Sequence, residues 1–279
     1  MDNLISAKTL KQHIGDNGWL IFDCRFNLAD TEQAQKNYQQ SHIPGAIYTH
    51  LDHHLSSPIT PDSGRHPLPD LSTLLQWLSF CGLQQKTRVV VYDDSAGAFA
   101  TRLWWMLKCL GHHSVCVLDG GWTGWVKAGF EADQQLPNLT ASQYEASFNG
   151  SLVKTTAEVF SNLNSQEFQL IDVRAGERFR GEMEPIDPVA GHIPGAINMP
   201  LTDNLDEDGL FKSPQQLREL YEDLSELFAT EQQVFMCGSG VTACHSVFAM
   251  CLAGFQMPRL YAGSWSEWIR DTARPVQSL

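Results

Sequence analysis

Cys237 and the short segment after it are the residues in this sequence best placed to do chemistry. The segment reads Cys237-Gly238-Ser239-Gly240-Val241-Thr242 and lies between an apolar strand-like run and a stretch with helical spacing. Its glycines allow the backbone to curl with N–H groups pointing inward, and the positive end of the following helix would point to the same place. Such a loop stabilises an anion, so we expect Cys237 to ionise near neutral pH and act as a nucleophile. A buried structural cysteine beside an ordinary turn is the alternative.

The two halves of the chain repeat each other, and the repeat bears on the role of this cysteine. Four landmarks recur in order: an apolar run closing on Asp-x-Arg, a His-Ile-Pro-Gly-Ala turn, a strand with a glycine-containing loop, and a Trp-x-x-Trp pair. They lie at 23–25, 42–46, 91–97 and 122–125 in the first half, and at 172–174, 192–196, 234–240 and 265–268 in the second. Asp94 stands where the second half has Cys237, so the scaffold does not require a thiol there. This difference favours a catalytic role for Cys237.

Strand-like and helix-like patterns alternate within each half. Short β-branched runs predict strands at 89–92, 115–118, 170–173 and 234–236, and longer apolar stretches predict buried helices at 99–110 and 242–252. The alternation predicts an α/β fold in which each half forms a central, mostly parallel sheet flanked by helices. We expect one domain over 1–135, a linker over 136–151 and a second domain over 152–279. Ligands bind beyond the carboxyl ends of strands in such sheets, where Cys237 is expected.

Taken together, these motifs resemble the tandem rhodanese-like domains of the sulfurtransferases. The resemblance covers nearly the whole chain and includes the segment Gly263-Ser264-Trp265-Ser266-Glu267-Trp268 near its end. The cysteine loop is similar to that of 3-mercaptopyruvate sulfurtransferases, whereas thiosulfate-specific rhodaneses typically carry basic residues just after the cysteine. The resemblance implies that Cys237 takes a sulfane sulfur from a small-molecule donor as a persulfide. It then passes the sulfur to cyanide, a thiol or thioredoxin, with Gly238, Gly240, Val241 and Thr242 cradling the anion.

The same resemblance implies a proton relay of Asp52, His66 and Ser239. In the mercaptopyruvate enzymes such a relay handles the proton of the leaving pyruvate enolate, and a histidine oriented by a carboxylate can act as general acid or base. His66 lies in Arg65-His66-Pro67-Leu68-Pro69, which matches the family's His-x-Leu-Pro. This relay requires the first domain to pack over the second. An ordinary polar loop around residues 52–66 is the alternative.

Arg178 is the arginine that the resemblance assigns to the donor's anionic group. An arginine fork suits the carboxylate of mercaptopyruvate or the sulfonate-like end of thiosulfate. The alternative is a surface arginine paired with Glu177 or Glu182. The family's mercaptopyruvate enzymes usually carry a second arginine nine residues later, where this chain has Asp187.

Loss of that second arginine would weaken mercaptopyruvate binding unless Arg180 or Arg65 replaces it. The uncharged loop with Ser239 favours mercaptopyruvate as the donor, and Asp187 leaves thiosulfate as the alternative. A persulfide carrier that serves a protein partner, or a redox thiol without sulfur transfer, would also use Cys237. A phosphatase loop would close on an arginine at the position that Ala243 occupies, so phosphate chemistry is disfavoured.

Composition sets broader limits. The chain has 279 residues, 43% of them hydrophobic, and a formal net charge of −13, which argues against a surface that binds nucleic acid or an anionic membrane. The amino terminus lacks the pattern of a signal peptide, so we expect a cytoplasmic protein. The seven cysteines include no C-x-x-C pair, and we expect no disulfides. No group of residues has the spacing of metal ligands, so we expect neither a metal nor an organic cofactor. His42 and His192 recur in both halves and are expected to fix turns.

Overall fold

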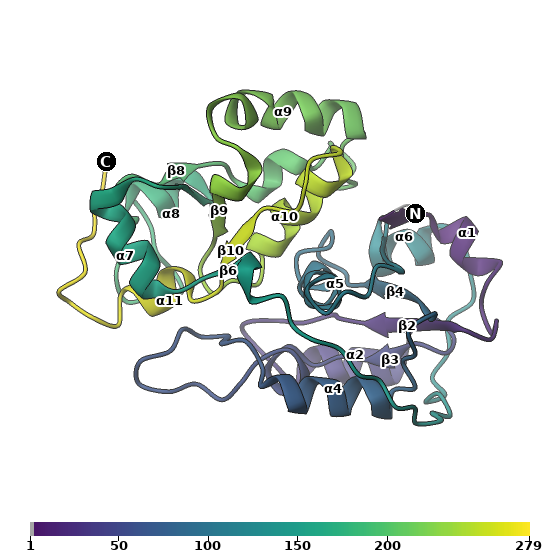
Figure 1. Cartoon of the computed structure of the whole chain (residues 1–279). Coiled ribbons are helices and arrows are strands. Elements are labelled where there is room, and N and C mark those ends of the chain that lie inside the picture. Colours follow the sequence, from purple (N-terminus) through teal and green to yellow (C-terminus); the bar gives the residue numbers. More distant parts are fainter. Residues whose placement is uncertain (1–2) are drawn as a thin grey trace. The chain divides into compact units, whose positions relative to one another are not determined.

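The first repeat forms a sheet of five parallel strands in the computed structural model, which describes residues 3–279 (Figure 1). The strand order is β1-β5-β4-β2-β3. Buried valines and other apolar residues fill the central strand β4, as a sheet covered on both faces requires. The strands are β1 (Leu4–Ile5), β2 (Trp19–Asp23), β3 (Ile47–Tyr48), β4 (Arg88–Tyr92) and β5 (Val115–Leu118).

The second repeat forms a sheet with the same topology. Its order, β6-β10-β9-β7-β8, matches the first sheet strand for strand, and all its neighbouring pairs are parallel. The predicted α/β fold with two parallel sheets is confirmed. The strands are β6 (Val153–Lys154), β7 (Gln169–Asp172), β8 (Ile197–Asn198), β9 (Gln233–Met236) and β10 (Arg259–Tyr261).

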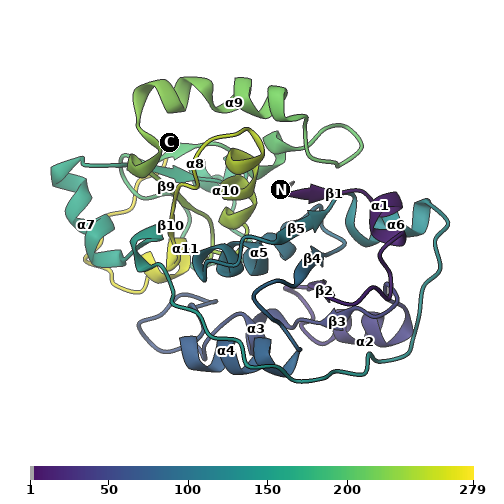
Figure 2. The ribbon, with the colours of Figure 1, turned by 45° about the vertical axis from the view of Figure 1, so that its right-hand side comes forward.

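Helices cover both faces of each sheet (Figure 2). In the first unit α5 packs on β4 and β5, whereas α1 and α6 share a core with the other face. In the second unit α10 packs on β9 and β10 and against α9, whereas α7 and α11 lie together on the opposite face. The α-helices are α1 (Ala7–Lys11), α2 (Gln33–Gln40), α3 (Leu51–His54), α4 (Leu71–Phe80), α5 (Ala100–Cys109), α6 (Gly121–Lys127), α7 (Thr156–Ser165), α8 (Gly176–Arg180), α9 (Pro214–Leu227), α10 (Ala243–Leu252) and α11 (Ser264–Trp268). Short 3₁₀ turns occur at Gly150–Leu152, Leu201–Asn204 and Thr230–Gln232.

The repeated landmarks stabilise the same positions in both units. Asp23 binds the Arg25 guanidinium at 2.6 Å and Asp172 binds Arg174 at 2.6 Å, and all four side chains are buried. The rings of His42 and His192 each lie 2.7 Å from a backbone carbonyl oxygen through Nδ1. These contacts are structural, as expected, because they are equivalent in a unit with the cysteine and a unit without it.

The boundary between the two units differs from a simple division of the chain. Residues up to 57 and 69–149 form the first unit, and residues 58–68 join 150–279 in the second. Hydrogen bonds fasten residues 58–68 to the rest of the second unit. Among them, Arg65 N–H donates to Ser266 Oγ at 3.0 Å, and Arg270 Nε donates to the Ser63 carbonyl at 3.0 Å. Residues 58–68 thus lie in the second unit although they precede the expected boundary. Within residues 3–279, no helix is long and apolar enough to span a bilayer.

Candidate active site

The cysteine loop lies where the second sheet changes the direction of its connections. The chain leaves central strand β9 toward β10 on one side, and it leaves the neighbouring strand β7 toward β8 on the other side. The carboxyl ends of two such strands border a crevice that typically binds ligands in parallel α/β sheets. Cys237 directly follows β9, and Arg178 lies in α8, the helix that follows β7.

Three hydrogen bonds fix the position of Cys237, which is 1% exposed. Its N–H donates to Ser264 Oγ at 3.1 Å, and its carbonyl accepts the Trp265 N–H at 3.1 Å. Its Sγ accepts the Gly240 N–H at 3.2 Å, as the anion-cradle prediction requires of the loop. Gly240 has φ +75°, and a Cβ there would collide with the Ala262 carbonyl oxygen, so only glycine suits this turn.

The remaining loop residues lead directly into α10. The Cys244 N–H donates to the Val241 carbonyl at 3.1 Å, and the His245 N–H donates to the Thr242 carbonyl at 3.2 Å. These bonds begin a ten-residue helix whose positive end faces the loop. Cys244 and Cys251 are the thiols of this helix, and neither they nor the other five cysteines form a disulfide.

Ser264 is a site residue that the sequence reasoning missed. Its backbone has φ +54°, which is uncommon for a residue other than glycine. Its hydroxyl donates to the Tyr261 carbonyl at 2.8 Å and accepts the Cys237 N–H. The first half has Gly121 at the equivalent position, also at positive φ. A serine replacing a glycine in the repeated motif was the available signal.

The structure brings His66 and Ser239 together. Ring atom Nδ1 of His66 lies 2.7 Å from Ser239 Oγ, and the two residues are 5% and 7% exposed. The segment 58–68 makes this possible because it belongs to the second unit. Asp52, the third residue of the predicted relay, belongs to the first unit and lies in α3, where its N–H donates to His50 Nδ1 at 3.1 Å. Its part in a relay stays a prediction.

Arg178 is paired with carboxylates other than those that the sequence suggested. Its Nε and Nη2 bind Glu184 at 3.0 Å and 2.7 Å, and Nη2 also reaches Asp187 Oδ2 at 3.3 Å. Neither Glu177 nor Glu182 takes this place, since Glu182 binds the exposed Arg180 at 2.8 Å. Arg180 is therefore not the substitute for the missing second arginine.

The guanidinium group of Arg65 lies near that of Arg178, and both contact Asp187. Its Nη1 binds Asp187 Oδ1. A Cβ built on Gly238 would lie 2.8 Å from Arg65 Nη2 and 3.6 Å from Arg178 Nη2, so both guanidinium groups lie against the residue after Cys237. Burial lowers the pKa of Arg65, and the nearby charge of Cys237 acts in the opposite direction.

The corresponding loop of the first unit already holds an anion. The carboxylate of Asp93 accepts the backbone N–H groups of Ser95, Gly97, Phe99 and Ala100 at 2.8 to 2.9 Å. Burial raises the pKa of Asp93, and the bonds from these N–H groups oppose that effect. The backbone of this repeated loop is thus built to surround a negative charge. In the second unit Met236 stands at the position of Asp93, so no carboxylate occupies the loop there. The Gly240 N–H binds the sulfur of Cys237 instead.

Comparison with known proteins shows the family of the chain. A model for the rhodanese-like domain matches residues 6–128 and again 155–271. The chain belongs to the rhodanese family. A curated protein of Pseudomonas aeruginosa named "Probable 3-mercaptopyruvate sulfurtransferase" is 46% identical over 275 residues, which is 98% of this chain and 97% of that relative. The thiosulfate sulfurtransferase of Mus musculus is 36% identical over 276 residues, 96% of this chain and 92% of the relative.

Two solved sulfurtransferase structures match nearly the whole chain. The 3-mercaptopyruvate sulfurtransferase from Leishmania major has a TM-score of 0.82 and 30% identity, covering 95% of this chain and 73% of that one. SseA from Escherichia coli, described as a 3-mercaptopyruvate sulfotransferase, has a TM-score of 0.81 and 29% identity, covering 95% and 100%. The predicted tandem rhodanese architecture is confirmed.

Among residues 3–279, one group of possible metal ligands lies in the first rhodanese domain. Its members do not follow a ligand spacing that could be recognised in the sequence. Glu32, His50 and His53 place one ligand atom each within 4.8 Å of one another. Nδ1 of His50 accepts the Asp52 N–H at 3.1 Å, which leaves the ring proton on Nε2. A ring in that form cannot ligate through Nε2, so this group does not fit a metal as it stands.

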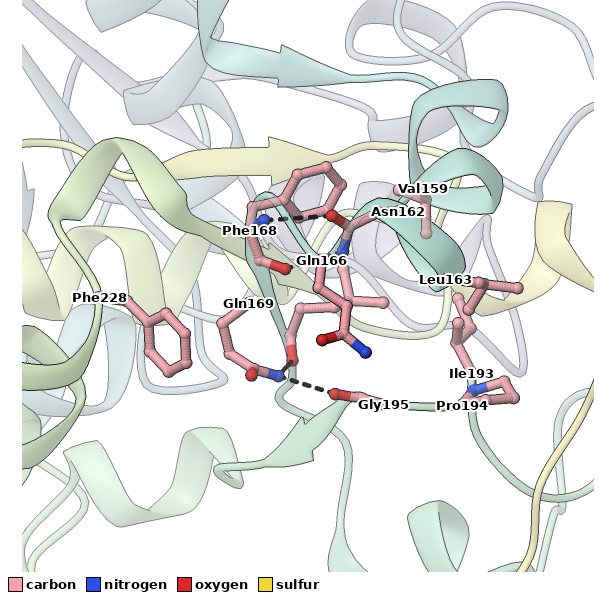
Figure 3. A pocket seen from close by; sticks show the side chains of 11 residues that line it. Val159, Asn162, Leu163, Gln166, Phe168, Gln169, Ile193, Pro194, Gly195 and Phe228 are labelled. Atoms are coloured by element: carbon pink, nitrogen blue, oxygen red, sulfur yellow. Dashed lines mark hydrogen bonds between the residues drawn. The ribbon is translucent and has the colours of Figure 1, made fainter.

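A cavity of about 330 Å³ lies at the amino end of β7 (Figure 3), whereas Cys237 follows the carboxyl end of β9. Phe168 and Gln169, at the amino end of β7, line it together with the turn at Gly195. Its polar groups bond to each other, since Gln169 Nε2 donates to the Gly195 carbonyl at 2.8 Å and Asn162 Nδ2 to the Phe168 carbonyl at 2.8 Å. Neither Cys237 nor any residue of its loop lines this cavity, so the cavity is separate from the cysteine site.

Proposed function

We propose that this protein is a sulfurtransferase that moves a sulfane sulfur from 3-mercaptopyruvate to a thiophilic acceptor through a persulfide on Cys237. The hydrogen bond between His66 and Ser239 is the observation that favours mercaptopyruvate over thiosulfate as the donor. Mercaptopyruvate brings a thiol proton that must move during the reaction, whereas thiosulfate brings none. His66 and Ser239, which lies two residues after Cys237, are both buried and can move this proton when mercaptopyruvate is the donor. With thiosulfate they have no proton to move.

The first half-reaction needs no oxidant or reductant. The Cys237 thiolate attacks the sulfur of mercaptopyruvate, and the bond between that sulfur and carbon 3 breaks. The electron pair goes to the carbon and gives pyruvate enolate. The donor's thiol proton passes through Ser239 and His66 to that carbon, and the products are pyruvate and the cysteine persulfide anion. We propose that Asp52 orients His66 when the relay acts.

The second half-reaction restores the cysteine. The acceptor, which is cyanide or a thiolate, attacks the outer sulfur of the persulfide, and the Cys237 thiolate leaves. The loop stabilises the persulfide anion by the Gly240 N–H and the positive end of α10. Asp93 in the first domain gives the physical precedent, since the same loop there surrounds a carboxylate.

Thiosulfate is the competing donor, because the relatives named above include a thiosulfate sulfurtransferase. Thioredoxin and other protein thiols are the acceptors that we propose beyond cyanide. A persulfide carrier would differ by slow turnover with both small donors and fast transfer to one protein. Seven cysteines outside any disulfide fit a reducing compartment, so we propose the cytoplasm as the site of action.

Steady-state kinetics with both donors test the proposal. We expect kcat/KM for mercaptopyruvate to exceed that for thiosulfate by more than tenfold, with cyanide as the common acceptor. Mass spectrometry should find one added sulfur atom on Cys237 after donor alone, and none in Cys237→Ser. Cys251→Ser, a change to another thiol of the second domain, serves as the matched control and should stay active. Activity in Cys237→Ser would overturn the mechanism.

A further inference from the structure

Two arginines and one aspartate form a cluster beside Gly238 that the proton relay and the persulfide cradle do not use. Arg65 comes from the segment that crosses into the second unit, and Arg178 comes from α8. Asp187 lies between them and binds one guanidinium with each carboxylate oxygen. Asp187 occupies the position where the sequence comparison expected a second arginine.

The carboxylates around Arg178 have different roles. Glu184 is 3% exposed in its side chain, binds Arg178 through two nitrogens, contacts Arg174 at 3.3 Å and accepts the N–H of Asp187 at 3.1 Å. These contacts make it a fixed support that orients Arg178. Asp187 reaches Arg178 through a single contact of 3.3 Å, and an anion of similar shape could replace that contact.

Arg65 retains unused hydrogen-bonding capacity. Its Nε is buried and has no hydrogen-bond partner among residues 3–279. A buried donor without an acceptor costs free energy, roughly 1–3 kcal/mol for a typical group, and an incoming anion would remove that cost. The guanidinium lies against Gly238, the residue that follows the reacting cysteine, and the charge of Cys237 acts on the pKa of Arg65.

We propose that Arg65 and Arg178 together bind the anionic end of the sulfur donor, and that Asp187 occupies this pair of arginines when no donor is bound. This inference rests on the proposed sulfur transfer and adds the specificity-determining residues. The ligand class is a small acid whose carboxylate or sulfonate lies next to its sulfur, as in a 2-oxo acid thiol. Two planar forks around one anion give directional recognition that a single arginine lacks. The residue that supplies the missing cation is therefore Arg65, from a different part of the chain.

The test compares three variants by donor kinetics. Arg65→Gln removes the second cation, Asp187→Asn removes the internal anion, and Arg180→Gln is the matched control, because Arg180 is exposed and bound to Glu182. We expect Arg65→Gln to raise KM for mercaptopyruvate at least tenfold with a smaller change in kcat. Asp187→Asn should lower that KM severalfold, since the arginines no longer carry a competing carboxylate. Arg180→Gln should change it less than twofold.

A neutral donor separates this inference from the proposed function. Mercaptoacetone carries the same thiol beside a ketone but has a methyl group in place of the carboxylate, and it can form the Cys237 persulfide with release of acetone. Because it has no anionic end, its rate of persulfide formation on Cys237 should be the same within twofold in wild type, Arg65→Gln and Asp187→Asn. If wild type forms no persulfide with any donor, the proposed function fails. If wild type forms it and Arg65→Gln keeps the wild-type KM for mercaptopyruvate, the clamp fails. A raised KM in Asp187→Asn would refute the competing role of Asp187. Arg65→Lys, which keeps the charge without the fork, should be intermediate and replaces Arg65→Gln if the latter does not fold.

Discussion

The hydroxyl oxygen of Ser264 lies 3.1 Å from the backbone nitrogen of Cys237, and the backbone of Ser264 holds a φ of +54° to place it there. The first domain has glycine at this position, which adopts positive φ without steric cost. A serine in this region of φ costs about 1 kcal/mol or more, so the strain is tolerated only where the side chain makes a needed contact. We interpret that contact as the support that fixes the cysteine at the start of its loop.

Two substitutions at Ser264 separate the hydrogen bond from the strain. Ser264→Ala keeps the positive φ and leaves the buried Cys237 N–H without its acceptor, so we expect a loss of about 1–3 kcal/mol in the free energy of unfolding. Ser264→Gly loses the same hydrogen bond but relieves the strain, and should be less destabilised by about 1 kcal/mol. Urea unfolding measures both. Single-turnover persulfide formation should slow in both variants, and equal stability of the two variants would show that the strain is absent.

The relay residues should affect the two donors differently. General acid–base catalysis contributes roughly 10² to 10⁴ in rate, so Ser239→Ala and His66→Asn should each lower kcat with mercaptopyruvate by about 10² or more. The same variants should change kcat with thiosulfate by less than about threefold, since that donor has no thiol proton to move. Asp52→Asn tests the third member of the relay and should lower only the mercaptopyruvate rate. Equal losses with both donors would mean that His66 and Ser239 only shape the loop.

Local sequence patterns predicted the strand, loop and helix of this site, but they did not predict its ion pairs. The strand that ends at Met236 and the helix that begins at Ala243 follow from apolar periodicity and from glycines that interrupt it. The exchange of Cys237 for Asp94 between the repeats marked the reactive residue. Arg65 and Asp187 are 122 positions apart, and their pairing depends on residues 58–68 joining the second unit. No periodicity encodes that choice, because it is set by contacts such as the one between Arg65 N–H and Ser266 Oγ.

The anion in the first domain's loop should be important for stability. Asp93 accepts four backbone N–H groups while it is 1% exposed, so Asp93→Ala would leave several buried donors unpaired. We expect a loss of about 3 kcal/mol or more in the free energy of unfolding, since each unsatisfied donor costs about 1–3 kcal/mol and the loop relaxes in part. Asp94→Ala, at the exposed neighbour, should change stability by less than about 0.5 kcal/mol. Similar losses in the two variants, measured by urea unfolding, would contradict the view that this loop is built around an anion.

A half-buried histidine of the first domain, His54, should make stability depend on pH. Burial is the largest cause that lowers the pKa of His54 to about 4, and its neutral Nδ1 accepts the His50 N–H at 2.9 Å. The unfolded chain binds this proton more readily, with an ordinary histidine pKa of about 6.5, so stability is present above that value and falls as pH drops from about 6.5 to 4. The loss in the free energy of unfolding across this window should be about 2–3 kcal/mol. His54→Asn keeps a hydrogen-bond acceptor that does not titrate, and it should reduce the pH dependence of urea unfolding there. Part of the dependence should remain, because burial also lowers the pKa of His50 and of His112. His13→Asn, at a histidine in an exposed ion pair with Asp16, is the control and should leave that dependence in place. A wild-type profile that stays flat between pH 6.5 and 4 would show that His54 is protonated in the folded protein.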